Sequence, residues 1–145
     1  SLGRISVDPL DPMSPLQVRF GEEIVLRGYD LTQSRESLRL TMYWQAQREM
    51  ERSYKVFVHL VDPGTGEIVE QYDAVPRLWT YPTNHWQPGE VVDDPISLSM
   101  SDVLPGHYEV KIGCYDPASG ERLPVYDEKG QPYPDGVLPL TTVHQ

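Results

Sequence analysis

The sequence predicts an all-β protein, an antiparallel β-sandwich of eight to nine strands with an immunoglobulin-like or jelly-roll-like arrangement. Three observations support this fold class. Apolar and polar residues alternate within several short segments. The 14 prolines and 11 glycines are spread between these segments, which is typical of short strands joined by turns. No segment of about 11 or more residues repeats its apolar side chains with a helical period.

Length and composition indicate one domain that covers residues 1–145. The chain is 39% hydrophobic, which is enough to form a core without a metal or a disulfide. Its net charge of −10 argues against nucleic acid and against an anionic membrane surface as partners. Direct membrane insertion is not expected, because the sequence lacks a run of about 18 apolar residues. The single cysteine, Cys114, allows no internal disulfide and is expected to be a buried strand residue.

The N-terminal part is expected to contain three strands. A short strand near residues 4–7 is followed by an irregular, proline-rich segment that ends at Pro15. The second strand covers residues 22–29. Residues 38–47 show the clearest alternation, which predicts one buried and one solvated face. The side chains on the predicted buried face are those of Leu38, Leu40, Met42, Trp44 and Ala46.

The remainder of the chain is expected to contain six more strands. They cover residues 54–61, 67–73, 91–100, 108–114, 121–126 and 136–143. Pro95 interrupts one of them, which predicts a sheet edge or a bulge, because proline cannot donate to a strand ladder.

An internal repeat joins four of these strands in pairs. Residues 54–73 and 108–127 align without gaps, with eight identities in 20 positions. The shared Asp-Pro-x-(Thr/Ser)-Gly-Glu run contains the residues that a tight turn requires. We therefore expect each repeat to form one hairpin, with Gly66 and Gly120 at equivalent positions of positive φ. A duplicated binding unit is the alternative interpretation.

The loop of residues 75–89 concentrates aromatic rings beside hydrogen-bonding side chains. Flat aromatic faces next to amide and imidazole groups suit the binding of sugar rings. The alternative is structural, with prolines that stiffen the loop and aromatic rings that lie in the core. The candidate ligand-binding residues are Trp79, Tyr81, Asn84, His85 and Trp86.

Catalytic and metal-binding motifs are not evident. There is no glycine-rich phosphate loop, no Cys/His ligand spacing and no nucleophile elbow. His59 is expected to be a hydrogen-bonded strand residue. Asp73, Asp93 and Asp94 could supply oxygen ligands to calcium, but such carboxylates are also the normal surface of an acidic protein. We therefore expect no catalytic residues, no metal site and no cofactor.

Several stretches together resemble one family of domains. They are Phe-Gly-Glu-Glu-Ile-Val-Leu-Arg-Gly-Tyr-Asp-Leu at 20–31, Leu-Arg-Leu-Thr-Met-Tyr-Trp-Gln-Ala at 38–46, Val-Phe-Val-His-Leu-Val-Asp at 56–62 and Pro-Thr-Asn-His-Trp-Gln-Pro-Gly-Glu at 82–90, with further agreement at 104–108 and 115–124. These motifs resemble the soluble C-terminal domain of some bacterial multi-pass membrane glycosyltransferases, which are similar to the lipid-linked-sugar-dependent protein mannosyltransferase type. The resemblance covers most of the chain and carries over no catalytic residues, because glycosyl transfer in that type belongs to the membrane portion.

The resemblance implies a β-sandwich excised from a larger membrane protein and placed on the extracytoplasmic face of the membrane. Its expected role is that of a non-catalytic accessory domain, whose partners are a glycan or acceptor, or the membrane portion of the parent protein. The alternative is a structural or protein-interaction module of the cell envelope that has no ligand. A free-standing hydrolase is disfavoured, since no acid/base pair or nucleophile stands out.

Overall fold

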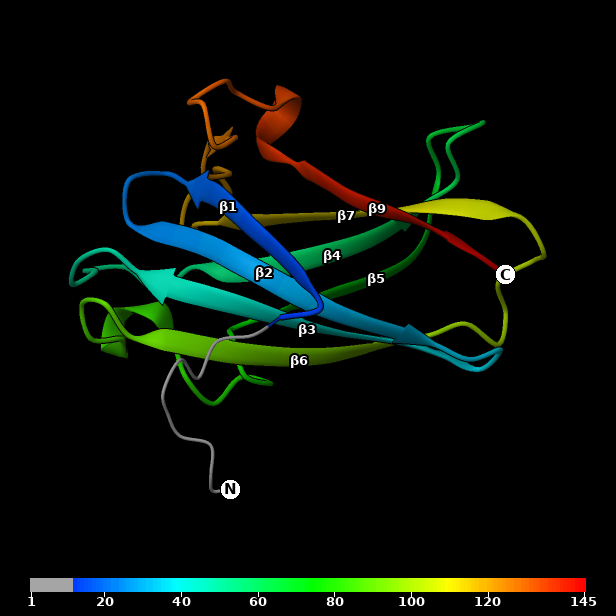
Figure 1. The fold of residues 1–145 in the computed structure, drawn as a ribbon, viewed down its shortest axis with the longest axis horizontal. Helices are drawn as coiled ribbons and strands as arrows, with labels where there is room; N and C mark the ends of the chain where they lie inside the picture. The colour runs from blue at the N-terminus through cyan, green and yellow to red at the C-terminus, as the bar shows by residue number, and fades with distance from the viewer. Residues whose placement is uncertain (1–11) are drawn as a thin grey trace.

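A computed structural model describes residues 12–145 as two antiparallel β-sheets stacked face to face (Figure 1). The five-stranded sheet has the order β6-β3-β2-β1-β8, and the four-stranded sheet has the order β5-β4-β7-β9. The prediction of an all-β sandwich with eight to nine strands is confirmed. Within residues 12–145, no helix has the length and apolar character that crossing a bilayer would need.

Most strand boundaries agree with the alternation in the sequence, but the strand predicted at residues 22–29 runs from 24 to 33, and the strand predicted at 121–126 is reduced to residues 125–126. The strands are β1 (Ser14–Phe20), β2 (Ile24–Gln33), β3 (Ser37–Ala46), β4 (Lys55–Val61), β5 (Ile68–Ala74), β6 (Val91–Ser99), β7 (His107–Tyr115), β8 (Val125–Tyr126) and β9 (Leu138–His144). Two short 3-10 turns are η1 (Thr83–His85) and η2 (Pro134–Gly136). The strand expected at residues 4–7 lies outside the described residues. Strand β1 was not predicted, because Pro15 and a register shift between Pro15 and Val18 obscure its alternation.

The core lies between the two sheets and is lined by alternate residues of their inner faces. All five side chains predicted for the buried face of β3 are 0% exposed. The Trp44 ring packs edge-on against Phe20, with 5.1 Å between ring centroids. Val56, Val58 and Leu60 of β4 face this core from the other sheet. Cys114 is buried as expected, and burial raises the pKa of its thiol.

Pro95 lies on an outer strand of the sandwich. Strand β6 is the last strand of the five-stranded sheet, and Pro95 is opposite Thr41 of β3. Of the two alternatives predicted for Pro95, a sheet edge or a bulge, the structure therefore confirms the edge. A proline fits at this position because an edge strand leaves one row of backbone groups outside the ladder.

The two repeated turns have the same geometry. Gly66 and Gly120 both have φ of 77°, and each donates its N–H to an aspartate carbonyl at 2.7 Å. The two aspartates, Asp62 and Asp116, each accept a further backbone N–H on their carboxylate at 2.9 Å. The predicted equivalence of the two turns is confirmed.

The segments that follow these turns differ, and this corrects the prediction of two equivalent hairpins. After the first turn, β5 pairs with β4 as predicted. After the second turn, the chain makes one bridge, between Tyr115 and Arg122, and then crosses to the other sheet, where β8 pairs with β1. Strand β9 occupies the place beside β7 that a returning strand would need. Residues 121–137 consequently run along one side of the sandwich, at the top of Figure 1.

Candidate functional site

The loop of residues 75–89 is anchored to the core at its C-terminal half. Trp86 is 1% exposed, and its indole N–H donates to the Tyr81 carbonyl at 3.0 Å. Its ring is part of the hydrophobic core, so for Trp86 the structure agrees with the alternative of an aromatic ring that lies in the core. The physical reason is that the loop folds inward at η1 and covers the end of the sandwich, where a large apolar ring gains most from burial.

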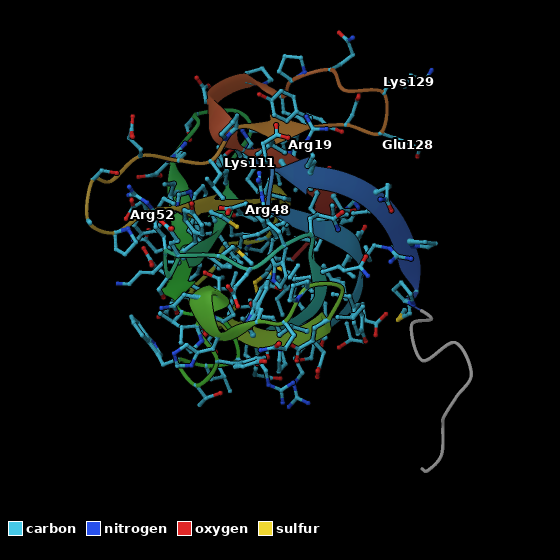
Figure 2. All side chains as sticks on the ribbon, turned by 90° about the vertical axis from the view of Figure 1, so that its left-hand side faces the viewer. Arg19, Arg48, Arg52, Lys111, Glu128 and Lys129 are labelled. Atoms are coloured by element: carbon cyan, nitrogen blue, oxygen red, sulfur yellow. The ribbon has the colours of Figure 1, made fainter. Side chains whose placement is uncertain are left out.

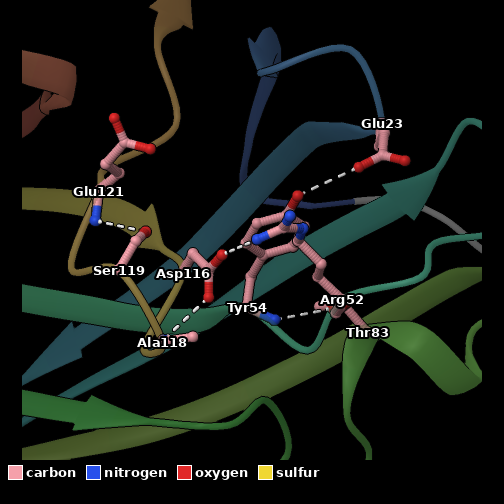
Figure 3. A network of polar contacts seen from close by, with 8 residues as sticks. All are labelled: Glu23, Arg52, Tyr54, Thr83, Asp116, Ala118, Ser119 and Glu121. Carbon is pink, nitrogen blue, oxygen red and sulfur yellow. Dashed lines mark hydrogen bonds and ion pairs between the residues drawn. The ribbon is translucent and has the colours of Figure 1, made fainter.

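A buried threonine fastens this half of the loop to the segment before β4. The Thr83 hydroxyl donates to the Arg52 carbonyl at 2.7 Å and accepts the Tyr54 N–H at 3.0 Å. Arg52 also forms an ion pair with Asp116 of the second repeated turn, and the Tyr54 hydroxyl reaches Glu23 at 3.3 Å (Figure 3). The N–H of Ala118 and the Arg52 guanidinium hold the pKa of Asp116 below its usual range. Four segments that are distant in the sequence are thereby tied together at this end.

Tyr81 also has an internal role. It is half-buried, and its hydroxyl donates to the Glu90 carboxylate at 2.8 Å. This hydrogen bond raises the pKa of the phenol. Its ring centroid lies 6.4 Å from that of Trp86. Asn84 and His85 are exposed on η1, so the structure separates these two polar residues from the buried aromatic ring that was expected to accompany them.

Of the predicted site residues Trp79, Tyr81 and Trp86, Trp79 is the one whose ring is open to solvent. It is 57% exposed, and its neighbour Leu78 is 55% exposed. The Lys55 ammonium group lies 4.6 Å from the centroid of the Trp79 ring, a distance that allows a cation–π interaction. Lys55 points away from the core, because its neighbour Val56 points into it. Trp79 is therefore beside the outer face of the four-stranded sheet.

An unusual backbone conformation presents this tryptophan. Arg77, Leu78 and Trp79 all have positive φ, at 57°, 55° and 72°. Consecutive residues other than glycine in the left-handed conformation raise the free energy of the backbone, and they persist only where surrounding contacts impose this conformation. The Arg77 N–H donates to the Asp94 carboxylate at 2.7 Å, and the Arg77 guanidinium pairs with Asp93 at 2.5 Å. The Trp79 N–H closes the turn on the Val75 carbonyl at 2.9 Å.

Asp94 connects this turn to the core. It is 1% exposed and also accepts the Trp44 indole N–H at 3.3 Å. Burial raises the pKa of Asp94 to about 6, although both N–H groups stabilise the charged form. The nearby Tyr72 hydroxyl is buried and has no hydrogen-bond partner within residues 12–145. Burial, together with the charge of Asp94, raises the pKa of that phenol.

The carboxylates considered for calcium all have protein partners or lie inside. Asp73 accepts the Tyr115 hydroxyl at 2.7 Å, Asp93 pairs with Arg77, and Asp94 is buried. In the part of the chain that the structure describes, no three His, Cys, Asp or Glu residues come together as a metal site would require.

The outer face of the four-stranded sheet continues from Trp79 as a row of aromatic and basic side chains. The Phe57 ring lies 4.6 Å from the His59 ring and 6.3 Å from the Tyr115 ring. The Arg122 guanidinium covers Phe57 at 4.8 Å. Burial and the positive charge of Arg122 lower the pKa of His59. We name this row the outer belt; its members are Trp79, Lys55, Tyr115, Phe57, Arg122 and His59.

The outer belt was not predicted from the sequence, although its members on β4 alternate with core residues. The alternation of β4 could have suggested an outward Lys55, Phe57 and His59. Their neighbours Trp79, Tyr115 and Arg122 come from three other segments, and only the fold brings these together.

Comparisons with known proteins give partial likenesses. No protein-family model matches the chain, and no curated protein matches it in sequence. β-Glucosidase 3B from Thermotoga neapolitana, solved in complex with glucose, is 17% identical with a TM-score of 0.40, over 74% of this chain and 17% of that one. Catalytically inactive OgpA from Akkermansia muciniphila, in complex with an O-glycopeptide substrate, is 8% identical with a TM-score of 0.41, over 97% of this chain and 34% of that one. This chain spans 17% and 34% of the lengths of those two proteins.

Proposed function

We propose that this chain is a non-catalytic accessory domain that binds a glycan, or the saccharide part of an acceptor, through Trp79. The observation that carries the proposal is the exposed indole of Trp79 on a braced turn at the edge of the outer belt. An apolar ring held in water gains free energy when the C–H face of a sugar covers it. The Lys55 ammonium beside the ring can donate hydrogen bonds to sugar hydroxyls.

The rigidity of the turn supports a binding role. Contacts to Asp93 and Asp94 hold the left-handed backbone in place before any ligand arrives. A site that is ordered in advance loses less conformational entropy on binding. Strained backbone of this kind occurs preferentially at ligand sites.

The polar groups around Trp79 favour binding over catalysis. Lys55 is opposite Tyr115 in the strand register, and the Tyr115 hydroxyl is bonded to Asp73. Donors and acceptors therefore lie next to the exposed ring. The nearby carboxylates of Asp73 and Asp93 are engaged by Tyr115 and Arg77, an arrangement that suits recognition of hydroxyl groups rather than acid/base chemistry.

The placement of the domain in a larger protein is also part of the proposal. The sequence resemblance supports attachment to a membrane glycosyltransferase-like parent, on the extracytoplasmic side. In that setting, the domain would hold a glycan or acceptor close to the transferase.

A glycan titration tests the proposal. The domain would be titrated with a panel of neutral oligosaccharides while tryptophan fluorescence and amide chemical shifts are followed. We expect shifts at residues 77–80 and a loss of affinity of about tenfold or more in Trp79→Ala, which removes one stacking face worth about 1.4 kcal/mol. Leu78→Ala is the matched control, since it truncates an equally exposed side chain that has no flat ring.

Stability measurements show whether a loss of glycan affinity in Trp79→Ala comes from the missing ring or from unfolding. Truncation of the exposed Trp79 should change the free energy of unfolding by no more than about 0.5 kcal/mol. If no glycan perturbs residues 77–80 at millimolar concentration, the glycan-binding role is excluded, and the alternative of a protein-interaction module takes its place.

A further inference from the structure

A groove lies on the outer face of the four-stranded sheet, along β4 from Trp79. Its volume is about 350 Å³, which is within the range of small-molecule sites. We name it the basic groove; its principal lining residues are His59, Val61, Ile68, Lys111, Arg122 and Val137.

Paired strands form the floor of the basic groove. His59 of β4 is directly opposite Lys111 of β7, so the two side chains lie next to each other on the outward face. The walls come from the first repeated turn with the start of β5, and from the segment around η2. Ile68 is 44% exposed on one wall, and Val137 is half-buried on the other. The groove thus combines polar groups on its floor with apolar walls.

Arg122 is held in position before any ligand binds. Its guanidinium rests on the Phe57 ring at 4.8 Å and donates to the Asp135 carbonyl at 3.1 Å. Phe57 can occupy that place because Gly113 has no side chain; a Cβ there would come within 2.3 Å of the ring. These contacts restrict the rotamers of a long side chain, which lowers the entropy that binding would cost.

The side chains that line the groove include more cations than carboxylates, in contrast to the protein as a whole. The chain has a net charge of −10, yet Lys111 and Arg122 bring two cations to this groove, and among residues 12–145 Asp135 is its one lining carboxylate. Lys111 also faces Glu109 at 3.7 Å, but both side chains are about a third exposed, so this pair is weak and exchangeable. A negatively charged ligand group would replace it at little cost.

We propose that the basic groove binds an acidic saccharide, with the carboxylate of a uronic-acid residue on Arg122 and Lys111 and its ring between the apolar walls. A guanidinium matches a carboxylate with two parallel N–H donors. The apolar walls favour a carboxylate attached to a ring over a bare anion. That the ligand is a saccharide rests on the proposed function. That this saccharide carries a negative charge is the new part of the inference.

One oligosaccharide could reach both positions. Lys55, beside Trp79, and His59, on the floor of the groove, are four residues apart on β4. Four strand residues span about 13 Å. An acidic oligosaccharide lying along β4 would therefore contact Trp79 with one ring and place its carboxylate in the groove.

The test compares three probes on the same protein. Galacturonate oligosaccharide, galactose oligosaccharide of the same length and inorganic phosphate would be titrated while amide chemical shifts are followed. We expect the acidic saccharide to shift residues of β4 and β7 around His59 and Lys111, and to bind about tenfold more tightly than the neutral one. This preference should decrease as salt is raised, because added ions screen exposed charges.

Matched charge variants locate the site. Lys111→Gln and Arg122→Gln should each weaken binding of the acidic saccharide about tenfold and leave that of the neutral saccharide unchanged. Lys129→Gln removes the same charge from an exposed lysine, which Figure 2 shows well away from Lys111. This control should keep the affinity within about twofold of the parent.

Each other outcome overturns the inference in a recognisable way. Equal binding of both saccharides, unaffected by Lys111→Gln, would exclude the acidic ligand and leave Trp79 as a neutral-sugar site. Phosphate binding as tight as that of galacturonate would show an anion site without saccharide recognition. If galacturonate does not bind at millimolar concentration, the groove has no such role, and the neutral titration alone then decides the proposed function.

Discussion

At the scale of single residues, Asp94 links the core to the candidate site. It receives one hydrogen bond from the buried Trp44 ring and one from the strained turn that presents Trp79. A carboxylate in this place holds the turn, but its negative charge is poorly solvated, and its pKa is therefore raised to about 6. The same side chain thus supports the geometry of the site and reduces stability near neutral pH.

We predict that Asp94→Asn removes part of the pH dependence of stability. Because the pKa of Asp94 is higher in the folded protein than its ordinary 3.8, its stabilising contribution is complete below about pH 4 and is lost as pH rises through about 6. A pKa shift of this size corresponds to a decrease of up to about 3 kcal/mol in the free energy of unfolding. Asparagine does not ionise and still offers an oxygen to the Arg77 N–H.

Urea unfolding of both proteins at pH 4, 5, 6 and 7 checks this prediction. Wild type should lose stability relative to Asp94→Asn across that interval. Taking the difference cancels contributions common to both proteins, such as that of Asp116, whose lowered pKa acts at more acidic pH. A constant difference would mean that Asp94 ionises normally in the fold.

At the scale of elements, the repeated turns show how closely a short motif can specify backbone geometry. Both turns place glycine at φ of 77° and use the same aspartate contacts. The strands that follow differ, because pairing depends on which strand edges are free. The motif therefore encodes a turn and not a hairpin.

We predict that Gly66→Ala and Gly120→Ala lower the free energy of unfolding by equal amounts. A Cβ at either position meets no atom within 4 Å, so only the left-handed backbone opposes the change, by about 1–2 kcal/mol. Gly64→Ala is the control, since the second turn already has Ala118 at the equivalent position. It should change the free energy of unfolding by about 0.5 kcal/mol or less. Thermal or urea unfolding would measure all three; clearly unequal costs for the two glycines would contradict the equivalence.

At the scale of the whole molecule, residues 121–137 join the two sheets and complete the outer belt. This segment places β8 against β1 in one sheet and lays Arg122 on Phe57 of the other. The close approach depends on Gly113, whose missing side chain leaves room for the Phe57 ring and the Gly136 carbonyl.

We predict that Gly113→Ala destabilises the protein by about 1–3 kcal/mol through overpacking. The new Cβ would lie 2.3 Å from the Phe57 ring and 2.9 Å from the Gly136 carbonyl. Phe57→Ala removes the first of these clashes. The double variant should therefore lose less unfolding free energy than the two single variants lose in sum. Unfolding free energies of the four proteins form the required cycle, and strict additivity would show that the two residues do not interact.

The sequence by itself determined those features that depend on near neighbours. The alternation of β3 placed Trp44 and its four companions in the core, and the Asp-Pro-x-(Thr/Ser)-Gly-Glu runs specified both turns. Pro95 indicated a sheet edge or a bulge, and the edge is what the fold has. These predictions succeed because strand periodicity and turn dihedrals follow from residues a few positions apart.

Three features were decided only by the tertiary structure. They are the exposure of Trp79 rather than Trp86, the burial of Asp94, and the path of the chain after the second repeated turn. Trp79 and Trp86 stand seven positions apart in one loop with similar neighbours, and their burial depends on η1 folding over the end of the sandwich. The basic groove joins His59, Lys111, Arg122 and Val137 from separate segments. Burial and pairing are set by what distant parts of the chain bring to each side chain, and no local pattern contains that information.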